Sequence, residues 1–371
     1  MMRSKSRTRV GRAALALAAC GLAAGMCEAA PMAKAVTANY DWHDGLALGL
    51  EGRGFASEAA PYTRLPERFK SVVTPKVWGL SQTSIGFNAR FVTDSDEVVL
   101  RWQVKPESPP IMYMSPVCHA GIDVFARSGT GAWRHVTCGA PEFKSGEGEL
   151  RVRWQKGEEC LVYLPVRARP RGFSVGVKKG CSFAKPPAHM TDKPVVIYGT
   201  SIVNGGSASR PGLIFTSIMG RLADVEVVNL GFSGAAKMEL PMADLVAEID
   251  ASLYILDCEH NMSCAVCKAN FEPFVRRFKE LRPDTPVLVC GGCTELTEPL
   301  SVERVTTGVM AKLRKEDPKK WANWSFLPGV DQLPKTDDCT HDHCHPNDLG
   351  YVFMGRVYAD KIKSILKKDA R

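Results

Sequence analysis

The fold of this chain is indicated by one stretch, VVIYGTSI, which runs from Val195 to Ile202. Its first five residues are apolar and end in glycine, a pattern typical of a strand buried on both faces of a sheet. Similar runs recur along the chain, and amphipathic helical patterns separate them. Alternating strands and helices predict a parallel sheet with helices on both faces. The later predicted strands are VEVVNLG (225–231), ASLYILDC (251–258), PVLVCGG (286–292) and a weak strand at 324–327.

The predicted helices lie after these strands. One opens at Pro211-Gly212, because proline favours the first turn of a helix. The others are expected at about 265–281, 302–314 and 347–366. In sheets of this kind ligands bind beyond the carboxyl ends of the strands, so the loops there should carry any chemistry.

The first half of the chain has a different pattern. Apolar and polar residues alternate with a period of two, and turn residues interrupt the runs at short intervals, as in SIGFNARFVTDSDEVVLRWQV (84–104). This pattern predicts the antiparallel strands of a β-sandwich. The expected organisation is therefore a β-sandwich domain at 36–185, a proline-bearing hinge at 186–194 and an α/β domain at 195–371.

Length, composition and charge agree with a folded two-domain protein. The chain has 371 residues, of which 45% are hydrophobic and 24% charged, and this balance excludes a disordered or fibrous protein. The formal net charge is +8, but residues 1–30 carry +4 of it. The remainder is too small to indicate nucleic acid as a partner.

The N-terminus predicts an export signal within residues 1–30. A basic stretch, Arg3 to Arg12, precedes the apolar run AALALAACGLAAGM, which is too short to span a bilayer. Cleavage near Ala29 or Ala30 would release a soluble chain. Alternatively, the preceding LAA marks Cys20 for acylation and a lipid anchor, although the apolar run continues past Cys20. In either case the protein is expected outside the cytoplasm, in the periplasm or beyond it.

The expected loops at one edge of the α/β sheet hold a serine, a glycine, an asparagine and an Asp-x-x-His pair. Acyl transfer needs a hydroxyl nucleophile activated by an imidazole, and a carboxylate that orients this imidazole. It also needs N–H donors for the oxyanion of the tetrahedral intermediate. The residues that meet these needs are Ser201, Gly234, Asn261, Asp342 and His345.

These blocks resemble those of the SGNH (GDSL-type) hydrolase superfamily, which implies a flavodoxin-like three-layer αβα domain. GTSI stands where that family has GDS-L, so Ser201 matches the nucleophile, while Thr200 replaces the usual aspartate. In NLGFSG, Gly234 best matches the oxyanion glycine of the second block, and Gly231 is a weaker candidate.

The third and fourth blocks complete the resemblance. Asn261 matches the oxyanion asparagine, although the usual G-x-N-D sequence is absent. Asp342 and His345 match the D-x-x-H-P block, including Pro346. The resemblance also implies that Ser201 gives its own backbone N–H to the oxyanion.

A bacterial subgroup of these esterases carries an N-terminal β-domain with a Gly-x-Asp-Leu-Tyr signature, and residues 121–125 (GIDVF) resemble it. The two resemblances cover about residues 62–366. They imply a serine esterase that removes short acyl groups, especially acetyl, from a carbohydrate. The N-terminal segment adds export, and the chemistry is expected to need no cofactor and no metal. The small residues Gly205 to Ala208 suit a shallow site. The alternatives are a lipase or lysophospholipase and a non-catalytic glycan-binding envelope protein. The β-domain would either bind glycan or form a wall of the cleft.

Ordinary structural roles compete with some of these assignments. Asn261 could cap the following helix, because asparagine favours that position. Gly234 could serve a turn that needs a positive φ. Arg210 could simply precede the helix start or contact an acidic substrate.

Seven cysteines lie in the second half and are expected on the rim of the active site. In an exported protein, disulfides that join the active-site loops are the favoured interpretation. The two C-x-x-C pairs, with His341, His343 and Cys344, could instead bind zinc, or the thiols could be free. The seven are Cys258, Cys264, Cys267, Cys290, Cys293, Cys339 and Cys344.

Overall fold

The computed structural model describes residues 37–106, 113–294, 299–334 and 336–369. The predicted export signal at 1–30, with Cys20, lies outside these residues. In the part of the chain that is described, no helix is both long and apolar enough to cross a membrane.

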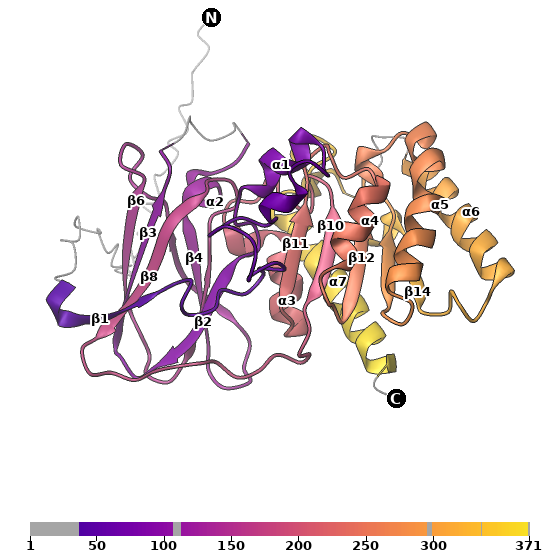
Figure 1. The fold of residues 1–371 in the computed structure, drawn as a ribbon. Helices are drawn as coiled ribbons and strands as arrows, with labels where there is room; N and C mark the ends of the chain where they lie inside the picture. Colours follow the sequence, from indigo (N-terminus) through magenta and orange to yellow (C-terminus); the bar gives the residue numbers. More distant parts are fainter. Residues whose placement is uncertain (1–36, 107–112, 295–298, 335, 370–371) are drawn as a thin grey trace, which may run out of the picture. The chain divides into compact units, whose positions relative to one another are not determined.

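The second half forms the predicted parallel sheet (Figure 1). The strands have the order β11-β10-β12-β13-β14, and every neighbouring pair is parallel. Because β10 pairs with both β11 and β12, the nucleophile loop that follows β10 leaves from the middle of the sheet. The strands are β10 (Val195–Gly199), β11 (Val227–Gly231), β12 (Leu253–Asp257), β13 (Val287–Cys290) and β14 (Trp324–Leu327).

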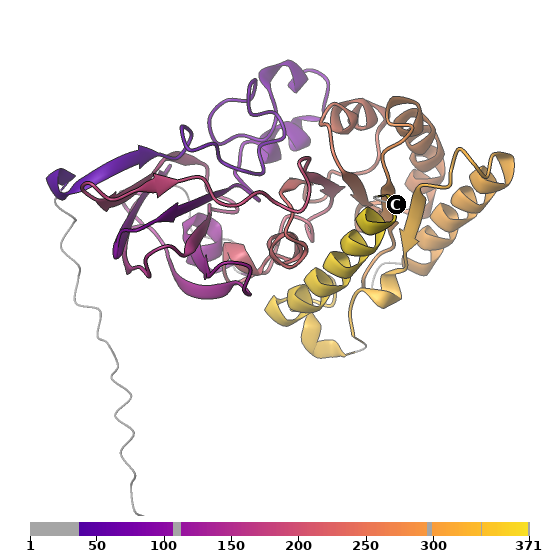
Figure 2. The same cartoon turned by 90° about the horizontal axis from the view of Figure 1, so that it is seen from below.

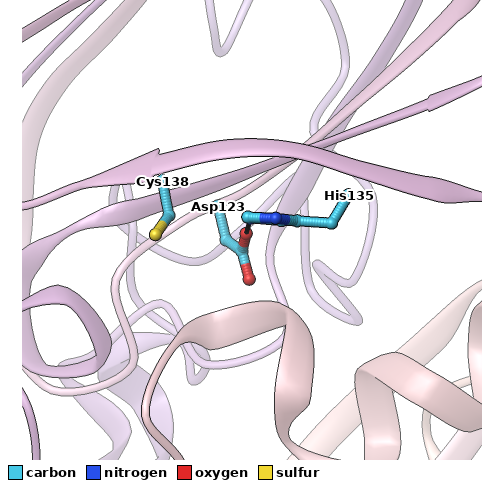
Figure 3. Close-up of side chains that lie close together, drawn as sticks. All are labelled: Asp123, His135 and Cys138. Atoms are coloured by element: carbon cyan, nitrogen blue, oxygen red, sulfur yellow. Dashed lines mark ion pairs between the residues drawn. The ribbon is translucent and has the colours of Figure 1, made fainter. Parts of the chain in front are cut away.

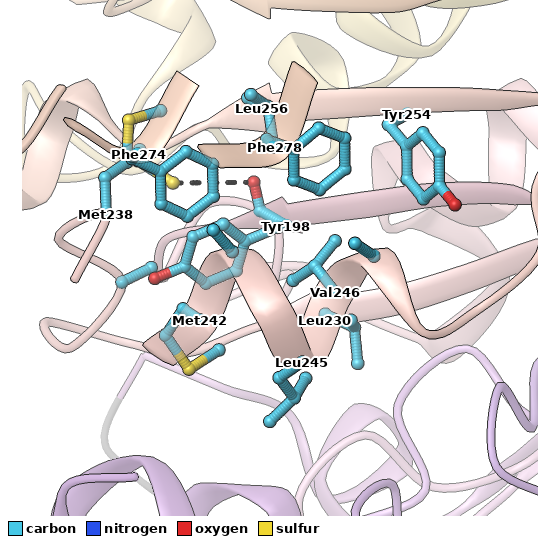
Figure 4. Close-up of a cluster of buried hydrophobic side chains, with 14 of the residues drawn as sticks. Tyr198, Leu230, Met238, Met242, Leu245, Val246, Tyr254, Leu256, Phe274 and Phe278 are labelled. Carbon is cyan, nitrogen blue, oxygen red and sulfur yellow. Dashed lines mark hydrogen bonds between the residues drawn. The ribbon is translucent and has the colours of Figure 1, made fainter. Parts of the chain in front are cut away.

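Helices cover both faces of this sheet, as Figures 1 and 2 show. Successive strand residues point to opposite faces, so Tyr198 packs on one side and Ile197 on the other. Figure 4 shows the first of these two cores, where Tyr198 and its neighbours meet the helices. Its helices are α4 (Leu240–Ala247), α5 (Cys264–Leu281) and α6 (Pro299–Glu316), and those of the opposite face are α3 (Phe215–Ala223) and α7 (Asp348–Asp369).

The β-rich first half consists of two antiparallel sheets with a shared core that includes Phe87, Phe91, Trp102 and Phe173. One sheet has the order β1-β8-β3-β6 and the other β5-β4-β7-β2-β9. The predicted fold class, an αβα domain preceded by antiparallel β structure, is therefore confirmed. The strands are β1 (Tyr40–Asp44), β2 (Asn88–Thr93), β3 (Glu97–Val104), β4 (Ile122–Arg127), β5 (Arg134–Gly139), β6 (Glu147–Arg153), β7 (Glu159–Tyr163), β8 (Pro170–Lys178) and β9 (Phe183–Ala184).

Two short helices interrupt the β-rich half, and the sequence analysis did not predict them. They are α1 (Pro75–Ser81) and α2 (Pro116–Ala120). Thr74 and Ser115 cap them, since each side chain accepts a hydrogen bond from a backbone N–H of the first turn, and a proline follows each cap. The 3-10 helices are η1 (Thr37–Asn39), η2 (Glu67–Phe69), η3 (Pro211–Leu213), η4 (Glu259–Asn261), η5 (Gly329–Asp331) and η6 (Asp337–Cys339).

Candidate active site

Ser201, His345 and Asp342 form a continuous hydrogen-bonded chain. Ser201 lies in the turn after β10, and His345 lies just before α7. The Ser201 Oγ atom is 2.8 Å from Nε2 of His345, and Nδ1 of His345 is 2.7 Å from Oδ2 of Asp342. The structure thus brings together the three residues that the sequence analysis placed in one site, and the spacing suits proton transfer between them.

The Asp342 loop fixes this carboxylate by backbone contacts. Its Oδ1 accepts hydrogen bonds from the backbone N–H groups of His345 at 2.7 Å and Cys344 at 3.0 Å. Partial burial raises the pKa of Asp342, but these bonds and the one from the His345 ring outweigh burial and lower it to about 2. Asp342 is therefore ionised at neutral pH, as a residue that stabilises an imidazolium must be.

Loop-to-helix contacts hold this catalytic segment in place. Asn347 caps α7, because its Oδ1 accepts from the N–H of Gly350 at 3.2 Å. Asp348, the first residue of α7, accepts from the N–H of Ser209 at 2.8 Å. This last bond joins the histidine segment to the loop that carries Ser201.

The two candidate glycines of the second block differ in the state of their N–H groups. Gly231 donates its N–H to Oδ1 of Asn229 at 2.9 Å, so that hydrogen is already engaged. Gly234 is exposed, has φ +65°, and its N–H donates to no other described residue. The N–H of Ser201 likewise donates to no other residue of the described chain. The geometry favours Gly234 over Gly231 as an oxyanion donor.

Asn261 ends η4, shortly after β12, and one hydrogen of its side-chain amide is already engaged in a hydrogen bond. The Nδ2 atom donates to the carbonyl oxygen of Phe232 at 3.2 Å, which fixes the amide beside the second block and leaves its other hydrogen for a ligand. The competing role as a helix cap belongs to Ser263 instead. The Ser263 hydroxyl accepts from the N–H of Val266 at the start of α5, at 3.3 Å.

Glu259 anchors the segment that carries Asn261. It is buried, and its carboxyl group accepts hydrogen bonds from the hydroxyl of Thr306 at 2.6 Å and the N–H of Gly292 at 3.1 Å. Burial raises the pKa of Glu259 to about 8, although these two bonds lower it in part. Burial likewise raises the pKa of Asp257 to about 7, against a hydrogen bond from Tyr358.

The raised pKa of Glu259 predicts that the stability of the protein depends on pH. The folded protein keeps a proton on Glu259 that the unfolded chain releases near the ordinary value of 4.5. Stability should therefore fall as pH rises from about 4.5 to about 8, by at most about 1.4 kcal/mol per pH unit for this group. We expect Glu259→Gln to flatten the decline of Tm between pH 5 and 8, measured by circular dichroism.

Asp257 should account for part of the slope that remains in this variant. Glu280→Gln, which changes an exposed glutamate on α5, is the matched control and should keep the wild-type slope. Equal slopes in all three proteins would contradict the assignment of the proton to Glu259.

Two residues that the sequence analysis missed shape the second block. Arg64 is fully buried and donates to the carbonyl oxygens of Gly231 at 2.8 Å, Asn229 at 3.1 Å and Leu80 at 2.6 Å. Burial, together with the nearby charge of Arg167, lowers the pKa of Arg64 to about 9. Arg64 lies about 170 residues from its β11 partners in sequence, so no local pattern could have shown this contact.

Asn204 is the second missed residue. It is buried in the nucleophile loop, and its Oδ1 accepts from the N–H of Ser233 at 2.9 Å. Asn204 thereby fixes the loop that presents Gly234 relative to the loop that presents Ser201. An asparagine three residues after the nucleophile was visible in the sequence, but asparagine is common in turns and gave no specific signal.

The β-rich half contributes to the rim of the site. The ring of Tyr113 stacks on His341 with centroids 5.1 Å apart and lies 6.3 Å from the ring of His345. This contact places a side chain of the β-rich half beside the catalytic histidine.

Asp123, from the GIDVF signature, clamps the loop that follows the nucleophile. Its carboxylate accepts from the Arg210 guanidinium at 2.8 and 3.0 Å and from the N–H of Gly212 at 2.8 Å. Figure 3 shows Asp123 beside His135 and Cys138, facing the α/β half. Arg210 therefore has a structural partner, and the suggestion that it contacts an acidic substrate is not supported.

Loss of this clamp should destabilise the protein. Asp123 is fully buried, so Asp123→Ala leaves the largely buried Arg210 without its partner. We expect a loss of about 3 kcal/mol in the free energy of unfolding, measured with urea. The control Asp244→Ala breaks an exposed pair with Arg277 and should cost less than about 1 kcal/mol. Similar losses in both variants would refute the clamp.

The expected disulfides are not found. All eleven cysteines of the described residues are free thiols. The sheet separates four of the thiols that the rim model brought together. Cys258 and Cys267 pack in the core on one face of the sheet, while Cys290 and Cys293 pack on the opposite face. Burial raises the pKa of Cys258, Cys290 and Cys293 well above the ordinary value, so these thiols stay protonated.

The zinc alternative also lacks support. Within the described residues, two groups of potential ligand atoms converge, and neither includes a C-x-x-C cysteine. One is Asp342 with His341 and His345, which is the catalytic arrangement. The other is Asp123 with His135 and Cys138, where Arg210 already occupies the carboxylate.

The fold and its loops are those of a carboxylic ester hydrolase. The chain belongs to the SGNH/GDSL hydrolases: residues 192–367 match the GDSL-like Lipase/Acylhydrolase family, and residues 40–183 match the N-terminus of Esterase_SGNH_hydro-type. The predicted family is thus confirmed over both halves. No match was found among curated proteins.

Solved structures give the same result. A protein described as a GDSL-like lipase, from Bacteroides ovatus, is 28% identical, with a TM-score of 0.78 over 89% of this chain and 98% of its own. The salicylyl-acyltransferase SsfX3 of a tetracycline biosynthetic pathway is 18% identical, with a TM-score of 0.65 over 90% and 99%. A family two carbohydrate esterase from Clostridium thermocellum, in complex with cellohexaose, is 10% identical, with a TM-score of 0.54 over 76% and 93%. The last two likenesses concern the fold alone.

Proposed function

We propose that this protein is an exported serine esterase that removes short acyl groups, acetyl above all, from a carbohydrate. The observation that carries the proposal is the hydrogen-bonded chain from Ser201 through His345 to Asp342, with distances of 2.8 and 2.7 Å. It lies at the carboxyl edge of the sheet in a domain of ester hydrolases.

The chemistry proceeds in two steps. Ser201 Oγ attacks the ester carbonyl carbon while Nε2 of His345 accepts its proton, and the resulting imidazolium is stabilised by Asp342. His345 then gives this proton to the departing alcohol oxygen, which leaves an acyl group on Ser201. In the second step water attacks the acyl-enzyme, His345 accepts a proton from that water, and the acid is released as Ser201 regains its hydrogen.

The oxyanion of each tetrahedral intermediate needs preorganised donors. The N–H groups of Ser201 and Gly234 and the second amide hydrogen of Asn261 fill this role in the proposal. Their positions are held by contacts that exist before substrate arrives, namely those of Asn204 with Ser233 and of Asn261 with Phe232. Preorganisation of this kind lowers the barrier because no reorganisation is needed as charge develops.

The substrate assignment is supported by the shape of the nucleophile loop. Gly206 approaches the site so closely that an added Cβ would lie 3.4 Å from the His345 ring. A glycine at this point places no side chain against the His345 ring, which suits a shallow site for a bulky alcohol such as a sugar. A carbohydrate esterase also occurs among the similar folds.

Acetate release tests the proposal. We expect the purified protein to hydrolyse p-nitrophenyl acetate and to release acetate from acetylated glycans, and Ser201→Ala to do neither. Preference for p-nitrophenyl palmitate over the acetate would instead establish the lipase alternative. Absence of activity on every ester would establish the non-catalytic alternative.

Export is part of the proposal and is supported by the basic and apolar segments within residues 1–30. Expression of the full chain in a bacterial host, followed by fractionation and N-terminal sequencing, tests it. We expect the mature chain in the periplasm, with a new N-terminus near Ala30. A blocked, lipid-modified N-terminus at Cys20 would establish the anchored alternative, and an intact Met1 would refute export.

A further inference from the structure

A cavity of about 590 Å³ lies outside the catalytic loops and is lined by four positive side chains. It is formed by the end of α1 and the two residues that follow, by the turn at 61–62, by Lys105 after β3 and by the segment that leads into β8. Its volume falls in the usual range for ligand sites. The positive side chains are those of Lys105, Arg167, Arg169 and Arg171, and the neutral polar ones include Gln82 and Thr83.

The three arginines alternate with Ala168 and Pro170 in the sequence RARPR, residues 167–171, and all three line the cavity. Residues 166–168 form a bend, and β8 begins at Pro170. The intervening Ala168 and Pro170 are buried, whereas Arg169 and Arg171 are exposed. The N–H of Lys105 donates to the carbonyl oxygen of Arg169 at 3.4 Å, which brings the fourth cation to the same segment.

None of these four side chains has a carboxylate partner among the residues that the structure describes. Elsewhere in the β-rich half, two buried arginines do have a carboxylate partner: Arg90 and Arg127 both pair with Glu159. Positive charge gathered in one cavity without compensation attracts an anion. Arginine in particular suits carboxylates, because its planar group donates two parallel hydrogen bonds.

The cavity is joined to the active site by α1. The Lys76 side chain at the start of α1 donates to the carbonyl oxygen of Gly234 at 3.4 Å, and Gly79, near the other end of α1, lines the cavity. Seven helical residues span about 10 Å, so the cavity lies within reach of a chain whose ester occupies the site. Arg64 connects the same elements, with bonds to Leu80 in α1 and Gly231 in β11.

We propose that this cavity is a subsite for the carboxylate of an acidic sugar, so that the preferred substrate is an acylated glycan that carries uronic acid residues. This inference rests on the proposed esterase function and specifies its substrate. The ester enters at Ser201, and an acidic residue of the same glycan chain binds Arg167, Arg169, Arg171 and Lys105.

The experiment compares substrates and variants. Arg169→Gln/Arg171→Gln removes two exposed charges and should leave folding intact. We expect wild type to show a higher kcat/KM on acetylated polygalacturonate than on acetylated xylan freed of uronic acids. The double variant should lose about tenfold on the acidic glycan, mainly through KM, and little on the neutral glycan or p-nitrophenyl acetate. Arg153→Gln, which changes an exposed arginine at the end of β6, should match wild type.

A binding measurement separates this inference from the esterase proposal. Ser201→Ala cannot turn over, so calorimetric titration with unesterified polygalacturonate reports the cavity alone. We expect binding that weakens with salt and weakens about tenfold when Arg169→Gln/Arg171→Gln is added. Equal binding with and without the two charge changes would overturn the subsite, whatever the activity of the wild type. An equal loss on p-nitrophenyl acetate would also overturn it, because the variant would then damage the catalytic site.

Discussion

Ser201→Ala and His345→Ala should each reduce esterase kcat by about 10⁵- to 10⁶-fold, and the double variant should be scarcely worse. The hydroxyl is a weak nucleophile until the imidazole 2.8 Å away accepts its proton, so removal of either group removes the same step. The measurement is single-turnover and steady-state kinetics on p-nitrophenyl acetate. A double variant whose loss equals the product of the single losses would contradict a shared mechanism.

Asp342→Ala belongs to the same series and should retain more activity than either single variant. The base remains in this protein, and only its orientation and the stabilisation of the imidazolium are lost. His343→Ala is the matched control, because His343 lies in the same loop and has no part in the hydrogen-bonded chain. It should keep wild-type turnover.

Asn261→Ala should lower turnover by about 100- to 1000-fold while KM changes little. The amide hydrogen is directed at charge that exists only in the transition state, so binding of the ground state scarcely depends on it. Steady-state kinetics on p-nitrophenyl acetate separate kcat from KM.

Ser263→Ala provides the opposite control for this prediction. Ser263 caps α5 two residues later, and its loss should lower stability by about 1 kcal/mol and leave turnover intact. A melting curve and kinetics on both variants therefore distinguish catalysis from helix capping. If Asn261→Ala instead melted lower and turned over normally, Asn261 would leave the oxyanion set.

The parallel sheet could be predicted because its strands are short, wholly apolar runs bounded by glycine or polar loops. Residues 324–327 were the weakest such run and still form β14. Helix α4 was missed, because eight residues beginning Leu-Pro and apolar on most sides give little helical periodicity. Its helical state depends on packing against β11 and α5, which no local pattern reveals.

The residues of the candidate site could likewise be predicted only where they lie in a local sequence motif. Ser201, Asp342 and His345 sit in local motifs, and the spacing of the D-x-x-H motif already favours the Asp342–His345 pair, whereas the contact of His345 with Ser201 depends on the fold. The disulfide model failed because the spacing of cysteines in sequence does not tell which face of the sheet each side chain enters. The role of Arg64 could not be predicted, because the carbonyl groups that it contacts in β11 lie in the other half of the chain.

The contacts of Arg64 bear on how the enzyme is assembled during its synthesis. Residue 64 is synthesised long before β11. The hydrogen bonds of Arg64 with the carbonyl oxygens of Asn229 and Gly231 can therefore form only after β11 has been made. Conversely, a fragment that begins at Val195 would contain every residue of the hydrogen-bonded triad and the three loops that carry Ser201, Gly234 and Asn261. It would lack the guanidinium that holds the second of these loops and the Asp123 carboxylate that holds the first. Both halves of the chain are therefore needed to hold the catalytic loops in place. The isolated hydrolase half should be a poor catalyst.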